Sequence, residues 1–118
     1  MNNIEVREFC LSLPHVTEDM PYGPDMVVFR IGNKIFLHLP LEYADPRISI
    51  KLPPEEAEIL RDTYSAITPA YHLNKRHWSE ILINGYLSDD QIKGWITESY
   101  NLVYSALPKK VKETFQLP

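Results

Sequence analysis

The strongest constraint on this chain is a pair of β-rich runs, 26–31 and 34–39, that are separated only by the Gly-Asn link at 32–33. Such a short link forms a tight hairpin, because glycine tolerates the positive φ that the twist of the strands demands. Counting outward from the turn places Phe29 opposite Phe36. Apolar residues fall on both faces of the hairpin, so we expect it to lie centrally in a sheet that is partly covered on each side.

Two further runs predict strands. Residues 47–52 alternate between apolar and polar side chains, with Ile48 and Ile50 expected inward and Lys51 outward. Residues 77–83 form a second β-rich run that Asn84-Gly85 ends, and a short extended piece is expected at 66–71. The stretch 15–25 is rich in Pro, Gly and acidic residues, and this composition predicts a connecting loop.

Three helices are predicted from their termini. Asn2 with Glu5 favours a helix start, and Pro53-Pro54 followed by acidic residues favours another. The Ser88-x-x-Gln91 capping box opens the last helix, which Pro108 ends, and the tail to Pro118 has the pattern of a further short helix. The resulting order, α-β(3)-α-β(2)-α, predicts an α+β fold of two layers, with the helices packed on one face of an antiparallel sheet.

Composition limits the classes of protein to which the chain can belong. Its 118 residues suit one domain, expected over 1–118, and a hydrophobic fraction of 44% excludes intrinsic disorder. The formal charge of -4 argues against a general nucleic-acid coat, because phosphate binding depends on Lys and Arg. Any nucleic-acid binding is therefore expected to be local.

Cellular context follows from the single cysteine and from the apolar runs. Cys10 cannot form an intramolecular disulfide and lies in an apolar helical pattern, so a reduced, cytoplasmic setting is the simplest interpretation. The N-terminus lacks a basic region followed by an apolar run, and no stretch approaches the roughly 20 apolar residues that span a bilayer. We expect no membrane association.

Several segments together resemble the MmcQ/YjbR family of small bacterial proteins: the 32–36 turn and strand, the 48–53 strand end, the 69–78 segment and the 99–103 patch of the last helix. The resemblance covers almost the whole chain. It implies an α-β(3)-α-β(2)-α fold, CyaY-like and related to the type III secretion chaperones. It also implies a DNA-binding protein with a double-wing motif, although fold alone does not determine function.

One basic and aromatic window stands out in this acidic chain. No acidic residue lies between Asp62 and Glu80, and that window holds cations, histidines and aromatic residues together. Basic side chains beside aromatic rings can contact phosphates and stack on bases, and the outer face of the 47–52 strand would extend the surface if it lies alongside. The alternative is that these aromatics are structural and the charges only solubilise a loop. The candidate nucleic-acid-binding residues are Arg47, Lys51, His72, Lys75, Arg76 and Trp78.

Other chemistry finds little support in the sequence. The four histidines have no tight ligand spacing and no companion cysteines, so no metal site is predicted. The chain has no nucleophile elbow, P-loop or dinucleotide fingerprint, and we expect neither a cofactor nor an enzyme activity.

The sequence leaves two functions open. The leading hypothesis is weak, salt-sensitive binding of DNA, since two to four phosphate contacts give a salt slope of only about -2 to -4. The alternative is a protein-interaction or chaperone-like module that uses its sheet face or a hairpin edge to hold a peptide or to dimerise. In either case a monomer or a weak homodimer is expected, and a small-molecule pocket between sheet and helices is a third possibility.

Overall fold

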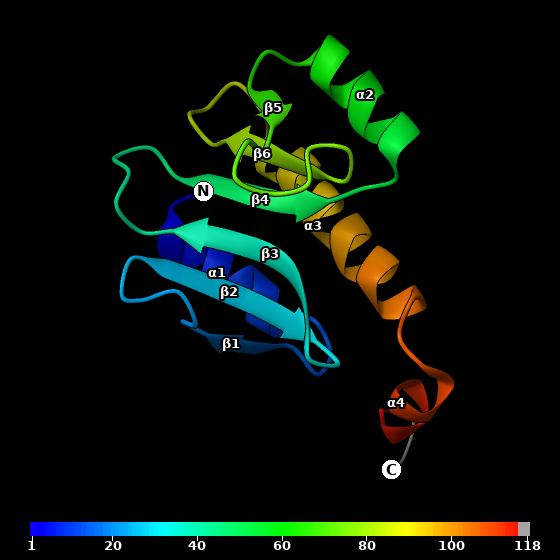
Figure 1. Cartoon of the computed structure of the whole chain (residues 1–118). Coiled ribbons are helices and arrows are strands. Elements are labelled where there is room, and N and C mark those ends of the chain that lie inside the picture. The colour runs from blue at the N-terminus through cyan, green and yellow to red at the C-terminus, as the bar shows by residue number, and fades with distance from the viewer. Residues whose placement is uncertain (116–118) are drawn as a thin grey trace.

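The structure is a computed structural model that describes residues 1–115. In it the predicted hairpin lies inside the sheet (Figure 1). Its strands are β2 (Met26–Ile31) and β3 (Lys34–Pro40). Gly32 and Asn33 have φ values of 56° and 71°, as a two-residue turn of this kind requires. Both hairpin strands have a hydrogen-bonded neighbour on each side, which confirms the central position predicted for them.

The six-stranded sheet has the order β1-β2-β3-β4-β6-β5, and every neighbouring pair is antiparallel. The predicted strand at 47–52 is β4 (Arg47–Lys51), that at 77–83 is β6 (Trp78–Leu82), and the short extended piece is β5 (Ile67–Pro69). The loop prediction for 15–25 was wrong in part, because β1 (Thr17–Asp19) adds an edge strand against β2. The three residues of β1 are all polar, so the sequence lacks the alternation of apolar and polar residues that predicts a strand. The strand is recognisable only from its pairing with β2.

The hairpin register was predicted correctly at the turn and wrongly beyond it. Ile31 pairs with Lys34, but a bulge follows, so that Phe29 lies opposite Leu37 rather than Phe36. The bulge shifts every later pair by one residue, which places His38 opposite Val28.

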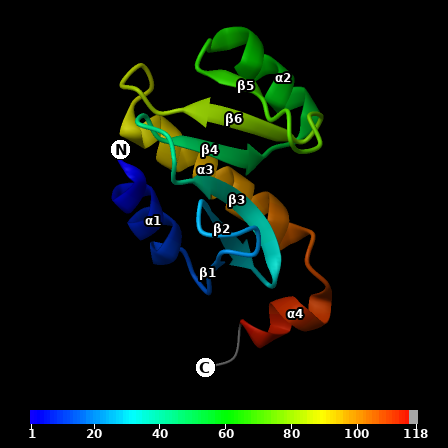
Figure 2. The ribbon, with the colours of Figure 1, turned by 60° about the vertical axis from the view of Figure 1, so that its left-hand side comes forward.

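The α+β fold class is confirmed, with the helices packed on one side of the sheet (Figures 1 and 2). The predicted capping box at Ser88 begins one of these helices, and the predicted helix start at Asn2 proves to be a second capping box, closed by Glu5. The tail forms a short helix, although residues 116–118 lie outside the described part of the chain. The helices are α1 (Asn3–Ser12), α2 (Pro54–Thr63), α3 (Asp89–Ser105) and α4 (Lys109–Thr114).

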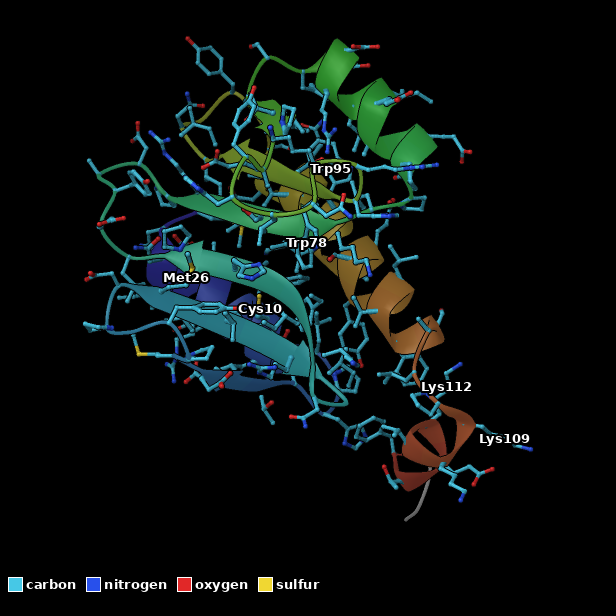
Figure 3. The ribbon with its side chains drawn as sticks, in the orientation of Figure 1. Cys10, Met26, Trp78, Trp95, Lys109 and Lys112 are labelled. Atoms are coloured by element: carbon cyan, nitrogen blue, oxygen red, sulfur yellow. The ribbon has the colours of Figure 1, made fainter. Side chains whose placement is uncertain are left out.

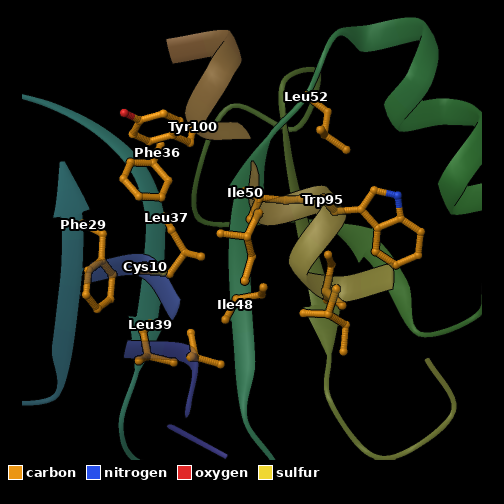
Figure 4. Packing of buried hydrophobic residues seen from close by; sticks show 14 of the residues in the cluster. Cys10, Phe29, Phe36, Leu37, Leu39, Ile48, Ile50, Leu52, Trp95 and Tyr100 are labelled. Atoms are coloured by element: carbon orange, nitrogen blue, oxygen red, sulfur yellow. The ribbon is translucent and has the colours of Figure 1, made fainter. Parts of the chain in front are cut away.

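The hydrophobic core lies between the sheet and the helices, as the close view of Figure 4 shows. The side chains of Leu37 and Ile50 are fully buried on this face, as is Cys10 of α1. Burial raises the pKa of the Cys10 thiol to about 12, so this cysteine is unreactive at neutral pH. Within residues 1–115, no helix combines the length and the apolar composition needed to cross a bilayer.

Two carboxyl groups meet where α2 lies beside α3. A hydrogen bond that the protonated Glu98 carboxyl donates to Glu56, followed by burial and by the charge of Glu56, raises the pKa of Glu98 to about 7. Because this pKa is higher in the folded chain, the pair stabilises the fold fully below the ordinary value of 4.5 and loses that contribution as the pH rises through about 7.

We therefore expect Glu98→Gln to increase stability above neutral pH and to flatten the pH profile. Urea unfolding of both proteins between about pH 5 and pH 8 measures the difference. Glu58→Gln, which changes an exposed glutamate on α2, is the matched control and should leave the slope unchanged. A wild-type profile that the Glu98 substitution does not alter would rule out the shared proton.

Candidate nucleic-acid interface

Two of the predicted site residues lie side by side at one end of the sheet. Lys51, the last residue of β4, is the cross-strand partner of Trp78, the first residue of β6. Both side chains lie on the sheet face opposite the core, because the neighbouring pair, Ile50 and Ser79, is buried on the core face and side chains alternate along a strand. The combination of a cation and an aromatic ring that the sequence predicted is thus one local unit.

A break in the sheet opens next to this pair. Strands β3 and β4 pair only at Leu37 with Ile50 and at His38 with Ser49. One residue further along, Lys51 would lie opposite Phe36, but the fully buried Ser99 of α3 comes between them. Its Oγ accepts a hydrogen bond from the Lys51 amide at 2.9 Å and donates one to the Phe36 carbonyl at 2.6 Å. The hydroxyl therefore replaces the ladder hydrogen bond that would otherwise join the strands.

The separated strands border a groove of about 480 Å³. Figure 1 shows that α3 runs behind this part of the sheet. Trp78 lies where the strands part, as Figure 3 shows. The last turn of α3 supplies Val103, and the two residues that follow the helix supply Ala106 and Leu107. Three cations, Arg30, Lys34 and Lys51, also line the groove. Among the described residues that line it, none carries a carboxylate.

Trp78 is held by an aromatic row on the outer face of the sheet. Its ring meets His38 edge to face at a centroid distance of 4.9 Å, and Tyr22 stacks on the other side of that histidine at 6.3 Å. Burial, and then the charge of Arg30, lower the pKa of His38 to about 4. The imidazole is therefore neutral at physiological pH, and it supports the indole without adding charge to the surface.

The loop between β5 and β6 leads directly into Trp78 and carries the remaining predicted residues of the basic window. His72, Lys75 and Arg76 are all exposed on it, and the Lys75 ammonium lies 4.9 Å from the centroid of the Tyr71 ring. Arg61 of α2 anchors this loop, because its guanidinium donates to the Lys75 and Trp78 carbonyls at 2.6 and 2.8 Å. This anchor fixes the loop immediately before Trp78, but His72, Lys75 and Arg76 do not themselves line the groove.

Arg47 is separated from the other candidates. It begins β4 and pairs with Leu82, whereas Lys51 ends the strand four residues later, about 13 Å away along extended chain. Its guanidinium lies 3.9 Å from Glu80 and 4.2 Å from the centroid of the Tyr43 ring. Part of its charge is thereby neutralised, and the structure does not bring it to the groove.

The sequence did not predict two of the cations that line the groove, nor the roles of Arg61, which anchors the loop, and Ser99, which bridges β3 and β4. Arg30 and Lys34 belong to the hairpin, whose apolar pattern hid their position next to Lys51. Arg30 is oriented by Asp19 of β1 at 2.8 Å and by the Asn33 carbonyl at 3.1 Å. The one available signal was a polar residue, Ser99, at a buried position of the last helix.

Other surfaces offer less chemistry. A larger hollow of about 570 Å³ lies at the opposite end of β4, next to Met1 and Asp45, and the described residues lining it include no lysine or arginine. Within residues 1–115, no cluster of three or more His, Cys, Asp or Glu side chains could hold a metal ion.

Comparisons with known proteins agree with the sequence resemblance. The family model named YjbR matches residues 11–102. The chain is 34% identical to the uncharacterized protein YbdF of Escherichia coli O157:H7 over 104 residues, which cover 88% of this chain and 85% of that one. It is 28% identical to YjbR of Escherichia coli K12 over 109 residues, or 92% of each chain.

Solved structures share the fold. The crystal structure of DR2400 from Deinococcus radiodurans, described as a DUF419 domain, superposes with a TM-score of 0.90 at 29% identity, covering 98% of this chain and 88% of that one. A Pseudomonas syringae protein superposes with a TM-score of 0.75 at 29% identity, covering 87% and 99% of the two chains. From the family match, the relatives and the shared architecture together, we conclude that the chain belongs to the YjbR family.

Proposed function

We propose that this protein binds single-stranded nucleic acid weakly, through the groove at Lys51 and Trp78 and the adjoining loop at 70–77. The observation that carries the proposal is the groove itself, where Lys34, Lys51, the Asp19-paired Arg30 and an indole converge and no carboxylate is present among the described lining residues. In a chain of net charge -4, such a concentration of positive charge favours an anionic ligand.

The two kinds of side chain have complementary tasks. Lysine and arginine neutralise phosphates and release counterions, while an aromatic ring stacks on an unpaired base irrespective of its sequence. A concave site lined by an indole suits bases that are already unstacked, which favours a single strand over a duplex. The exposed Lys75 and Arg76 would continue the contact along the backbone of the strand.

The expected affinity is modest. Two to four phosphate contacts predict a slope of log K against log salt of about -1.4 to -2.8 for a single strand. Acidic residues elsewhere on the chain oppose a long contact, and the slope above corresponds to a loss of about 25- to 600-fold in affinity for a tenfold increase in salt.

Fluorescence anisotropy of a labelled single-stranded oligonucleotide at low salt tests the proposal. We expect Lys51→Ala to weaken binding several-fold and to reduce the salt slope by about 0.7, the contribution of one phosphate contact. The double variant Lys75→Ala/Arg76→Ala should weaken binding further, and an unlabelled duplex should compete less well than a single strand.

The matched control is Lys109→Ala/Lys110→Ala, which removes the same number of charges from exposed positions of the α4 region. It should change affinity only slightly. Equal losses for the two double variants would indicate a nonspecific charge effect, and wild-type protein that fails to bind at low salt would refute the function itself.

The protein-interaction alternative finds only short stretches of free strand edge. β1 and β4 flank the hairpin, β4 pairs with β3 only at Leu37 and His38, and the edge strands β1 and β5 are three residues long each. Short edges disfavour the addition of a peptide strand. This alternative therefore depends on the outer sheet face, and protein partners that persist in a pull-down after nuclease treatment would support it.

A further inference from the structure

The groove is a built feature of the fold rather than a surface irregularity. The Ser99 hydroxyl satisfies the two backbone groups exposed where β3 and β4 part, so the strands stay separated without leaving a buried donor or acceptor unpaired. The bulge at Phe36 and the edge-to-face contact of its ring with Tyr100, centroids 5.5 Å apart, hold the β3 side of the opening. Its shape is therefore present before any ligand arrives.

One part of the groove wall is apolar and another part is positively charged. The end of α3 and the Trp78 indole provide apolar surface, whereas Lys34 and Lys51 approach from the hairpin turn and from the end of β4. Neither lysine takes part in an ion pair within residues 1–115. A ligand that fits has a flat apolar body and an anionic group attached to it.

We propose that this groove holds one unpaired nucleotide unit, with its base against Trp78 and the end of α3 and its phosphate between Lys34 and Lys51. The inference rests on the proposed function and assigns it a specific contact. The volume of about 480 Å³ lies within the range of roughly 300–1,000 Å³ typical of small-ligand sites, so the groove admits a single nucleotide and not a paired helix. The rest of a strand then follows the exposed loop at 70–77.

The test titrates thymidine monophosphate and follows the Trp78 indole N–H signal by NMR, assigned by comparison with Trp78→Phe. We expect a saturable shift at concentrations of about 1 mM, and at least about tenfold weaker responses to thymidine and to inorganic phosphate, each of which lacks half of the contacts. An equal response to inorganic phosphate would overturn the proposal, because it would reduce the groove to a general anion site.

A filling variant separates the groove from the surrounding charge. Ala106 is exposed and lines the groove, so Ala106→Leu should occupy the site without disturbing the core, and we expect it to weaken nucleotide binding at least about tenfold. Ser105→Leu changes the preceding exposed residue, which does not line the groove, and should bind as the wild type does. Unchanged binding by the Ala106 variant would contradict the assignment.

The outcomes distinguish this inference from the proposed function. If an oligonucleotide binds but the monophosphate leaves Trp78 unaffected, the groove assignment fails and nucleic-acid binding stands. If the monophosphate binds in the groove but no oligonucleotide does, the groove assignment stands and the proposed function fails. Failure of both ligands to bind overturns both.

Discussion

Replacing Ser99 with alanine is expected to lower the free energy of unfolding by about 2 to 4 kcal/mol. The hydroxyl lost is fully buried and serves two backbone groups, the Lys51 amide and the Phe36 carbonyl. Each group left without a partner costs about 1–3 kcal/mol, and the strands cannot close to pair with each other while α3 stands behind them. Urea unfolding measures the change.

A serine on the same helix provides the control. Ser105 is exposed, and its hydroxyl donates to the Asn101 carbonyl within its own helix, so Ser105→Ala should change stability by no more than about 0.5 kcal/mol. Equal effects of the two substitutions would show that the bridge across the strands contributes nothing. Hydrogen exchange offers a second readout, because the Lys51 amide should lose protection in Ser99→Ala before the rest of β4 does.

A comparable loss, about 2 to 4 kcal/mol, is expected for Gly32→Ala at the tip of the hairpin. The φ of Gly32 is 56°, a conformation that costs an alanine about 1–2 kcal/mol. An added Cβ would also lie 2.6 and 2.9 Å from the two methyl carbons of Leu107 and 3.1 Å from Val111. Leu107 is buried and lines the groove, so relieving the clash would disturb the α3 wall.

Gly94→Ala is the contrasting control, because the same substitution should have the opposite sign there. Gly94 lies within α3 and has open space around its added Cβ, so alanine should stabilise the helix by about 0.5–1 kcal/mol. The double variant Gly32→Ala/Leu107→Ala should be less destabilised than the sum of its two single variants, because the smaller side chain removes the clash. Strict additivity would show that backbone strain alone explains the loss.

Local chemistry explains which parts of the fold were predictable. The Gly-Asn turn, the alternation along β4, the helix start at Asn2 and the capping box at Ser88 each act within a few residues, and each appears in the structure as predicted. The bulge beyond Arg30 could not be predicted from turn counting, because it depends on how the helix layer meets β3. Strand β1 was missed for a similar reason, since its pairing with β2 is tertiary.

The candidate site shows the same division. The basic and aromatic window predicted Trp78 as a candidate, and the alternation of β4 correctly placed Lys51 on the outer face, so only the β4–β6 pairing was needed to place the two side by side. Arg47 lies on the same face but at the other end of the strand. The alternation of side chains predicts which face a residue occupies, but not how far apart two residues on that face lie. Lys34 reaches the groove from the hairpin turn, which required the full arrangement of hairpin, sheet and α3.

The proposed binding of single-stranded nucleic acid at the groove beside Lys51 and Trp78 can be mapped residue by residue. A short single-stranded oligonucleotide is titrated into the ¹⁵N-labelled protein at low salt, and every backbone amide and both indole N–H signals are followed. We expect the largest shifts at Lys34, Lys51, Trp78 and the loop at 70–77, and we expect them to diminish as salt is added. Shifts concentrated at the hollow beside Met1 and Asp45, or none at all, would contradict it.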